Sequence, residues 1–422
     1  MAVLGWRKPV AGDRLADSVS VGALERVFTR DLVDEVIDAC GRREQRVRAL
    51  PARVMAYFCL GMALWSEGSY DDILAYVSAG LLWSSGEGDG EPAQLASKPA
   101  VTYARRRLGP EPLEAMFRRA AVPLAQEGQE GCWLGGRRVM AIDGTTLDVP
   151  DSKPNAKHFG RAGVSKGEKA AYPMARVVAL AECGTHAICD AEIGTYTTSE
   201  VALSRALVDR FTPGMLVIAD RGFYGYDLWV RAVATGADLL WRAKSNMKPV
   251  FIKDLGDGSW LGEIRSGGKA GNKATPIKVR VVDYTVEDGT TTTTTSDDSD
   301  DVDSDDSGEK RFRLITTVLD PDDIAADDLA VAYWERWEIE SVFDELKTHQ
   351  RGARAVLRSK SPEMIHQEVW AMLCCHYAIR DMMADVAVRT GRDPDRVSFV
   401  AALRIARESA AHQGGFPPSP TT

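Results

Sequence analysis

The hydrophobic positions recur with a helical period over the first part of the chain. Apolar residues three and four apart predict a helix in TRDLVDEVIDACG, with a Thr cap before it and Gly41 as its stop. The nearly unbroken apolar run LPARVMAYFCLGMALW predicts a buried helix, and a polar, Gly-rich loop, SSGEGDGEP, follows a further helical segment. These patterns predict a helical domain over residues 1–130.

After about residue 131 the pattern changes to short apolar runs that alternate with amphipathic helices. The predicted order is three strands (RRVMAIDGTTLDVPD, ARVVALAE and HAICDAEIG), a capped helix (SEVALSRALVDRF), a strand (GMLVIAD), a helix (YDLWVRAVATG) and a strand (ADLLWRAKS). This order permits an α/β core that covers residues 131–245 and resumes over 312–350, where RFRLITTVLD predicts another strand.

The alternation stops between residues 246 and 311. Short extended pieces and Gly-rich turns predict a mostly β insertion there. Its segment 287–309, EDGTTTTTTSDDSDDVDSDDSGE, has ten acidic and no basic residues, so it cannot bury apolar surface and is predicted to be a disordered acidic loop. C-terminal helices are predicted over 351–422, where VWAMLCCHYAIRDMMADVAV reads as a long buried helix.

One stretch, YWERWEIESVFDELK, combines helical period with an unusual set of charges. In an α-helix Tyr333, Arg336, Glu340 and Lys347 fall within one narrow arc, because their spacings are three, four and seven residues. A carboxylate beside a guanidinium, an ammonium and a phenol is suited to holding a metal ion and phosphates together. The simpler interpretation of this stretch alone is a charged amphipathic helix with intrahelical ion pairs.

Two further motifs favour the functional interpretation. Asp143 lies in VMAIDGTTLDVPD, in an apolar run predicted to be a strand, and MLVIADRGFYG holds Asp220 at the end of another predicted strand. With the spacing Y-(2)-R-(3)-E-(6)-K, here Tyr333, Arg336, Glu340 and Lys347, the sequence resembles the DDE transposases of insertion-sequence family four. The resemblance runs from about the second helix to near the C-terminus, and it implies a ribonuclease-H-like core.

The resemblance also implies the metal ligands. Asp143 would bridge two Mg²⁺ ions (Mn²⁺ as a substitute), Asp220 would hold one of them, and Glu340 would complete the other. Asp344 lies on nearly the same helix face as Glu340 and is the main competing carboxylate. Near Asp143, only Asp151 could share its strand face, and an intervening Pro makes this pairing a weak alternative.

Several other residues are candidates for DNA contacts. The signature residues other than Glu340 would grip the phosphates around the scissile bond, and Arg221 would assist them. In the family a Trp of the insertion can stack on a flipped base, which makes Trp260 the first candidate and Trp241 the second, with a core role equally open for each. The remaining candidates for backbone contacts, all of which could equally be solvated surface residues, are Lys244, Lys248, Lys98, Arg105, Arg106 and Arg107.

The net charge becomes informative only when it is calculated separately for each segment of the chain. The 422 residues carry a net charge of −9, but removing the ten acidic residues of 287–309 leaves about +1. Residues 241–280 contain nine Lys/Arg and three Asp/Glu, which agrees with a nucleic-acid partner. Seven cysteines without a C-x-x-C pair argue against a disulfide framework or a zinc site of that kind. No run reaches membrane-span length, which predicts a cytoplasmic protein, and the resemblance implies that it is bacterial and nucleoid-associated.

The expected function is therefore cut-and-paste transposition. The chain would bind the terminal inverted repeats of its element, cleave the strands with divalent metal, and join the ends to target DNA. Because two ends must be held together, the resemblance implies a homodimer on double-stranded DNA. Two alternatives stay open, namely a nuclease of the same fold without strand transfer, and an inactive or domesticated copy that only binds DNA. The second is kept open because the chain ends in HQGGFPPSPTT, without a basic tail.

Overall fold

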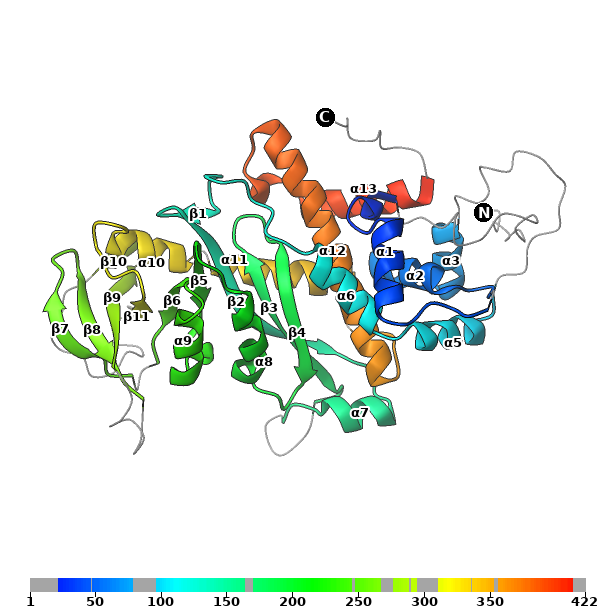
Figure 1. Ribbon diagram of the computed structural model, residues 1–422, viewed down its shortest axis with the longest axis horizontal. Coiled ribbons are helices and arrows are strands. Elements are labelled where there is room, and N and C mark those ends of the chain that lie inside the picture. Colours follow the sequence, from blue (N-terminus) through cyan, green and yellow to red (C-terminus); the bar gives the residue numbers. More distant parts are fainter. Residues whose placement is uncertain are drawn as a thin grey trace.

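The computed structural model is organised around one large mixed sheet with helices on both faces (Figure 1). It describes residues 22–46, 48–78, 96–163, 170–244, 247–266, 276–287, 290–293, 310–334, 336–352 and 356–412. Within these ranges the sheet has 11 strands, and the protein is a mixed α/β structure as predicted.

The middle of the sheet is formed by five strands in the order β4-β3-β2-β5-β6. β2 (Arg137–Asp148), β3 (Met174–Glu182) and β4 (Ile188–Thr195) form an antiparallel meander. β5 (Met215–Ala219) and β6 (Asp238–Arg242) are parallel to β2. All five predicted strands of this part of the chain are confirmed, because each apolar run is long enough to pair along its length.

The predicted β insertion extends this sheet beyond β6. β11 (Lys310–Thr316) pairs with β6, and β9 (Ile277–Glu287), β8 (Ser259–Ile264) and β7 (Val250–Asp254) follow in that order. β11, which follows the insertion in sequence, thus joins the insertion to the core by pairing with both β9 and β6.

The predicted disordered loop is partly a strand. β10 (Thr290–Thr293) pairs with β9, so the expectation of irregular structure is wrong for these threonines, whose β-branched side chains favour extended backbone. Residues 288–289 and 294–309 lie outside the described residues. The predicted loop SSGEGDGEP also lies outside them. At the other end of the core, the short β1 (Trp133–Leu134) pairs with the start of β2.

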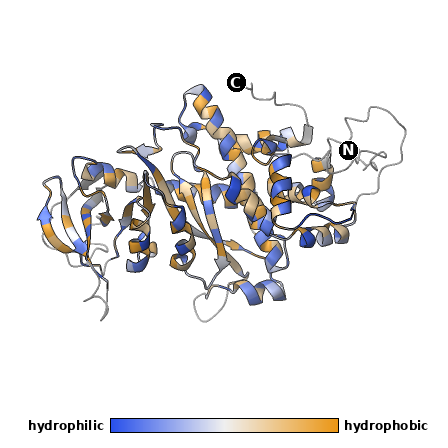
Figure 2. Cartoon of the chain, viewed as in Figure 1, coloured by the Kyte–Doolittle hydropathy of each residue, from blue (hydrophilic) through white to orange (hydrophobic). Residues whose placement is uncertain are grey.

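Successive side chains of the strands enter two separate cores, as the pleat requires. Met140 and Ile142 of β2 face α8 (Glu200–Leu207) and α9 (Tyr226–Val233). Val139 and Ala141 belong to the larger core on the opposite face. Figure 2 shows hydrophobic colouring along the central strands, which lie between helices.

The larger core is organised by α12 (Pro362–Thr390), which is buried over most of its 29 residues. The helices near it are η2 (Gly22–Arg26), α1 (Arg30–Ala39), α2 (Ala52–Leu64), α3 (Tyr70–Ser78), α5 (Lys98–Leu108), α6 (Glu111–Ala120), α7 (Lys153–Phe159) and α13 (Phe399–His412). α12 packs against α2, α6 and α13 and also reaches β4, so it joins the N-terminal helices to the sheet. Among the described helices, none combines the length and hydrophobicity needed to span a membrane.

The signature segment is not one continuous helix. α10 (Ala326–Trp334) and α11 (Trp337–Asp344) are separate, and a π-helix, η7 (Glu345–Gln350), follows α11 directly. At the junction, the backbone N–H of Arg336 bonds to the carbonyl of Tyr333, three residues earlier. The prediction of a single helix is therefore wrong, and the reason lies in the contacts of the site.

Candidate active site

Two aspartates lie side by side on the central strands. β2 and β5 are parallel, and Ile142 is the register partner of Ala219. The next residue on each strand is Asp143 and Asp220, and adjacent strands lie about 4.8 Å apart. Asp220 follows the end of β5 as expected, but Asp143 lies in the middle of β2, because β2 continues its pairing with β3 as far as Asp148.

The signature residues converge on this pair. The Tyr333 hydroxyl donates a hydrogen bond to Asp220 Oδ1 at 3.1 Å, and Arg336 Nη1 donates one to Asp143 Oδ2 at 3.3 Å. Arg336 Nη2 also lies 3.6 Å from Glu340 Oε1, so a single guanidinium links two of the three carboxylates. Residues more than a hundred positions apart in sequence therefore form one polar cluster.

Lys347 joins the same region through β2. Its Nζ donates a hydrogen bond to Thr145 Oγ1 at 3.1 Å, two residues beyond Asp143. Thr145 and Asp143 point to the same face of the strand. An exposed ammonium, a guanidinium and a phenol thus surround the carboxylates, as the sequence predicted for the four signature residues.

Burial makes the charge on Asp143 costly. Desolvation raises the pKa of Asp143 from its ordinary 3.8 to about 6, and the neighbouring carboxylates of Glu200 and Asp220 add to this, while Gly144 N–H and Arg336 oppose it. Desolvation also raises the pKa of Tyr333, with the charge of Asp220 beside it. A carboxylate that is held near others in a low-dielectric site gains strongly from a bound cation.

The carboxylates of Asp143, Asp220 and Glu340 fit a hard divalent cation. All three present oxygen ligands, the kind that Mg²⁺ prefers, and burial raises the pKa of Asp143 even with Arg336 beside it. Glu340 has a side chain that is 46% exposed, so it is free to rotate toward the two aspartates. We call these three residues the carboxylate triad.

The competing carboxylates have other partners. Asp344 accepts a hydrogen bond from the Thr348 hydroxyl and faces His349. Asp151 is paired with Arg161, away from the triad. Glu345 is buried among basic groups on the other side of α11, as the periodicity predicted. The described contacts therefore favour Glu340 over Asp344 as the third carboxylate.

Sequence reasoning missed three residues of this region. Arg242 Nη1 lies 3.9 Å from Asp220 Oδ1, and Glu200 lies so close to β2 that a Cβ on Gly144 would approach its Oε1 to 2.7 Å. Thr145 holds Lys347. Arg242 ends a predicted strand next to the one that ends at Asp220, and this shared strand end was the available signal.

The structure contradicts one predicted DNA contact on α5. Arg105 is 0% exposed, and its guanidinium donates hydrogen bonds to Gln367, Tyr70 and Ser359. It is a core residue that ties α5 to α12 and to the segment before it, and the prediction that it faces phosphates is wrong. Arg106, its neighbour, is exposed.

The other predicted contacts differ in exposure. Trp241 is buried against Trp229, so of the two roles left open for it, the structure favours the core role over base stacking. Trp260 is half-buried beside Phe251, with ring centroids 5.7 Å apart, and Arg313 lies over its ring. Lys248 and Arg221 are exposed, whereas Lys244 is half-buried.

A group of arginines lines a cavity of about 410 Å³ next to the end of α1. We call this group the arginine cluster, and it consists of Arg42, Arg43, Arg46, Arg48 and Arg107. Glu44 is the carboxylate among its lining residues. Arg42 is paired with Glu111 and Arg43 with Asp38, while Arg46 and Arg48 are exposed. No motif in the sequence indicated this cluster.

Comparison with known proteins identifies two regions of this chain. Residues 18–118 match the family described as insertion element 4 transposase N-terminal, and residues 134–378 match the transposase DDE domain. The chain is 25% identical over 376 residues to transposase InsG for insertion sequence element IS4 of Escherichia coli K12, which covers 87% of this chain and 78% of that protein. It is also 31% identical over 154 residues to the putative transposase InsZ of the same organism, 36% of this chain and 52% of that protein.

The DDE domain implies a ribonuclease-H-like fold, a DNA substrate and the use of divalent metal. The domain match covers more than half of the chain and includes the whole of the carboxylate triad and the four signature residues. The protein therefore belongs to the DDE transposases of the insertion element 4 family.

Proposed function

We propose that this transposase binds the terminal inverted repeats of its insertion sequence and performs metal-dependent strand cleavage and strand transfer by a cut-and-paste route. The observation that carries the proposal is the convergence of Tyr333, Arg336 and Glu340 on Asp143 and Asp220. The order of the five central strands supports a ribonuclease-H-like core for this chemistry.

The carboxylate triad would hold two Mg²⁺ ions. Two such ions activate the attacking oxygen and stabilise the leaving oxygen of a phosphodiester. The chain's own cations would then position the DNA. Arg336 has a planar fork that suits two phosphate oxygens, and Lys347 offers a mobile point charge above Thr145. Tyr333 keeps Asp220 oriented through its hydroxyl.

We infer that the N-terminal helices hold the ends of the element, with the arginine cluster as a phosphate-binding surface. Arg42, Arg43 and Arg107 are paired with Glu111, Asp38 and Glu44, so the surplus positive charge of this cavity rests on the exposed Arg46 and Arg48. Trp260, with the exposed Phe251 beside it, remains the candidate for stacking on an unpaired base, and Lys248 for a backbone contact. A homodimer is proposed because two ends must be held together.

An end-cleavage assay tests the catalytic part of the proposal. Purified protein is mixed with DNA from the ends of its element and with Mg²⁺, Mn²⁺, Ca²⁺ or a chelator. Cleavage is expected with Mg²⁺ or Mn²⁺ and is expected to be lost with chelator and in Asp143→Ala, while binding is retained. Strand-transfer products with a supplied target separate a transposase from a nuclease, and cleavage by purified Asp143→Ala would refute the assigned site.

Binding of the ends is tested by a salt titration. The double variant Arg46→Ala/Arg48→Ala is expected to weaken DNA binding and to reduce the slope of log K against log[salt] by about 2, one unit for each lost phosphate contact. Arg106→Ala, on the exposed face of α5, is the matched comparison for the helix that the sequence favoured. An unchanged slope in the double variant together with a reduced slope in Arg106→Ala would show that DNA binds at α5 and not at the arginine cluster.

A further inference from the structure

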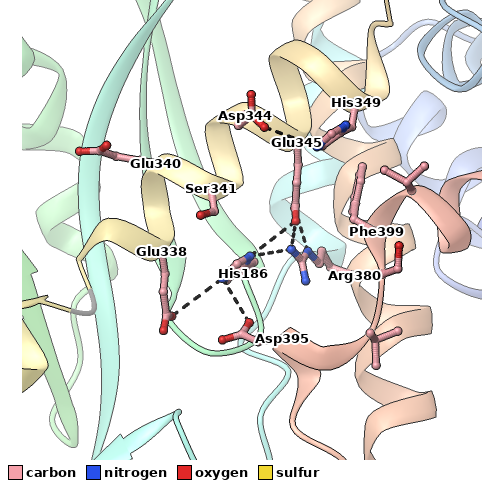
Figure 3. Close-up of a pocket in the computed structure, with 13 residues that line it drawn as sticks. His186, Glu338, Glu340, Ser341, Asp344, Glu345, His349, Arg380, Asp395 and Phe399 are labelled. Atoms are coloured by element: carbon pink, nitrogen blue, oxygen red, sulfur yellow. Dashed lines mark hydrogen bonds and ion pairs between the residues drawn. The ribbon is translucent and has the colours of Figure 1, made fainter.

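A second group of metal-ligating side chains lies behind α11 (Figure 3). His186 comes from the turn between β3 and β4, Glu338 from α11, and Asp395 from η8 (Pro394–Arg396). One ligand atom of each lies within 4.8 Å of the other two. His186 Nε2 is 3.3 Å from Asp395 Oδ1 and 4.0 Å from Glu338 Oε2, whereas Figure 3 shows Glu340 pointing away from the group.

The ring of His186 is aimed into this group and is incompletely satisfied. Its residue is 8% exposed, and its Nε2 has no hydrogen-bond partner among the described residues. A buried polar atom without a partner costs free energy unless something binds it. The backbone of His186 also has φ = 57°, the left-handed region that residues other than Gly adopt rarely, so the fold holds this side chain here against its local preference.

The surroundings of the other ring nitrogen are compatible with a metal on Nε2. Arg380 Nη2 donates a hydrogen bond to Nδ1 at 2.6 Å, and Glu345 Oε1 lies 3.6 Å from the same atom. An imidazole that binds metal through Nε2 carries its proton on Nδ1. Metal binding would therefore replace the bond from Arg380 Nη2 to Nδ1. Glu345 would accept the hydrogen bond of the Nδ1 proton, and Arg380 would keep its bond from Nε to Glu345 Oε2 at 3.0 Å.

We propose that His186, Glu338 and Asp395 bind a divalent transition-metal ion at a site separate from the carboxylate triad. One imidazole and two carboxylates suit Zn²⁺ or Mn²⁺ better than Mg²⁺, which avoids nitrogen ligands. The group opens onto a cavity of about 780 Å³, so water can complete the coordination.

The ion would connect three separate parts of the chain. It would tie the β3–β4 turn and the η8 turn to α11, two residues from Glu340. Glu338 already accepts a hydrogen bond from the backbone N–H of Gly184 in that turn, so the turn and the helix are in contact before any ion binds. The site would therefore fix the position of the helix that carries the third carboxylate of the triad.

Metal binding without DNA tests this inference. The full-length protein is first saturated with Mg²⁺ to fill the triad, then titrated with Co²⁺ and followed by its visible ligand-field absorption, and in parallel with Zn²⁺ by calorimetry. One equivalent is expected to bind in each case. His186→Asn and Asp395→Asn are expected to lower the affinity at least tenfold, and His349→Asn, a second histidine of the same cavity, is expected to bind like the wild type.

These variants separate loss of a ligand from loss of folding. Asn tolerates the left-handed backbone of position 186, and Asp395 lies in a partly exposed turn. Absence of Co²⁺ or Zn²⁺ binding in the Mg²⁺-loaded wild type would overturn the inference. Unchanged binding in His186→Asn would overturn it as well. Neither readout needs DNA or cleavage, so a failure here is distinct from a failure of the proposed transposition chemistry.

Discussion

Replacing Asp143 by Asn is expected to make the protein more stable while it abolishes cleavage. Burial raises the pKa of this carboxyl from 3.8 to about 6, so the folded protein above pH 6 carries a charge that the unfolded chain holds more cheaply. A shift of about two units corresponds to about 3 kcal/mol at pH 8. Asn has the same shape, but it accepts a weaker hydrogen bond from Arg336, which reduces the stabilisation of the variant by about 1 kcal/mol. The net gain is about 2 kcal/mol.

The pH dependence of this gain follows from the sign of the shift. Below pH 3.8 the carboxyl is protonated in both the folded and the unfolded state, and it contributes no penalty. Between pH 3.8 and about 6 the unfolded chain releases its proton first, so the penalty on the wild type grows, and it is complete above pH 6. At pH 5 the penalty on the wild type is roughly half of its value at pH 8.

Urea denaturation of both proteins without divalent metal, at pH 5 and pH 8, measures the difference. Asp143→Asn should unfold at a higher urea midpoint at pH 8, with a smaller advantage at pH 5. Adding Mg²⁺ should stabilise the wild type more than the variant, because the cation binds the ionised carboxylate. The reasoning is wrong if the variant is the less stable protein at pH 8, or if the gap between the two is the same at both pH values.

Four further variants test neighbouring contacts. Glu340→Gln should abolish cleavage in the end-cleavage assay and leave DNA binding intact, whereas Asp344→Asn should cleave normally; the reverse result would exchange their roles. Tyr333→Phe removes a hydrogen bond to Asp220 and should slow cleavage about tenfold or more without changing the melting temperature. Although burial opposes it, hydrogen bonds from histidines and a nearby arginine hold the pKa of Glu345 well below its usual range. Glu345→Gln should therefore lower the free energy of unfolding, measured by urea denaturation near pH 7, by about 3 kcal/mol. This loss should become smaller as the pH falls below 4.

The strands were predictable because they depend on local pattern, whereas the pairing of the two aspartates was implied only by the resemblance to the transposases. The apolar runs around Asp143 and Asp220 are short, and each is bounded by turn residues. Once two such runs pair in parallel, the residues that follow equivalent positions must be neighbours. The register itself, with Ile142 opposite Ala219, came only from the structure, because periodicity fixes a face and not a partner.

The error at Arg105 was avoidable from the sequence. Val101 and Leu108 lie four and three residues from it and are both buried, so Arg105 belongs to the apolar face of α5. Naming Arg105 together with Arg106 and Arg107 as a candidate for DNA contacts ignored this period. Its partners were not predictable, because Gln367 is more than two hundred residues away, and a buried guanidinium is stable only when such partners satisfy it.

The break between α10 and α11 was not predictable from local sequence, because the segment contains no Gly or Pro and every residue accepts a helix. What accompanies the break is tertiary. Tyr333, on the last turn of α10, is bound to Asp220, and Arg336, just before α11, is bound to Asp143. In one straight helix the rise of 1.5 Å per residue would spread the four signature residues over about 20 Å. The break places two of them on adjacent aspartates, which indicates that the geometry of the carboxylates, rather than helix propensity, sets the path of this segment.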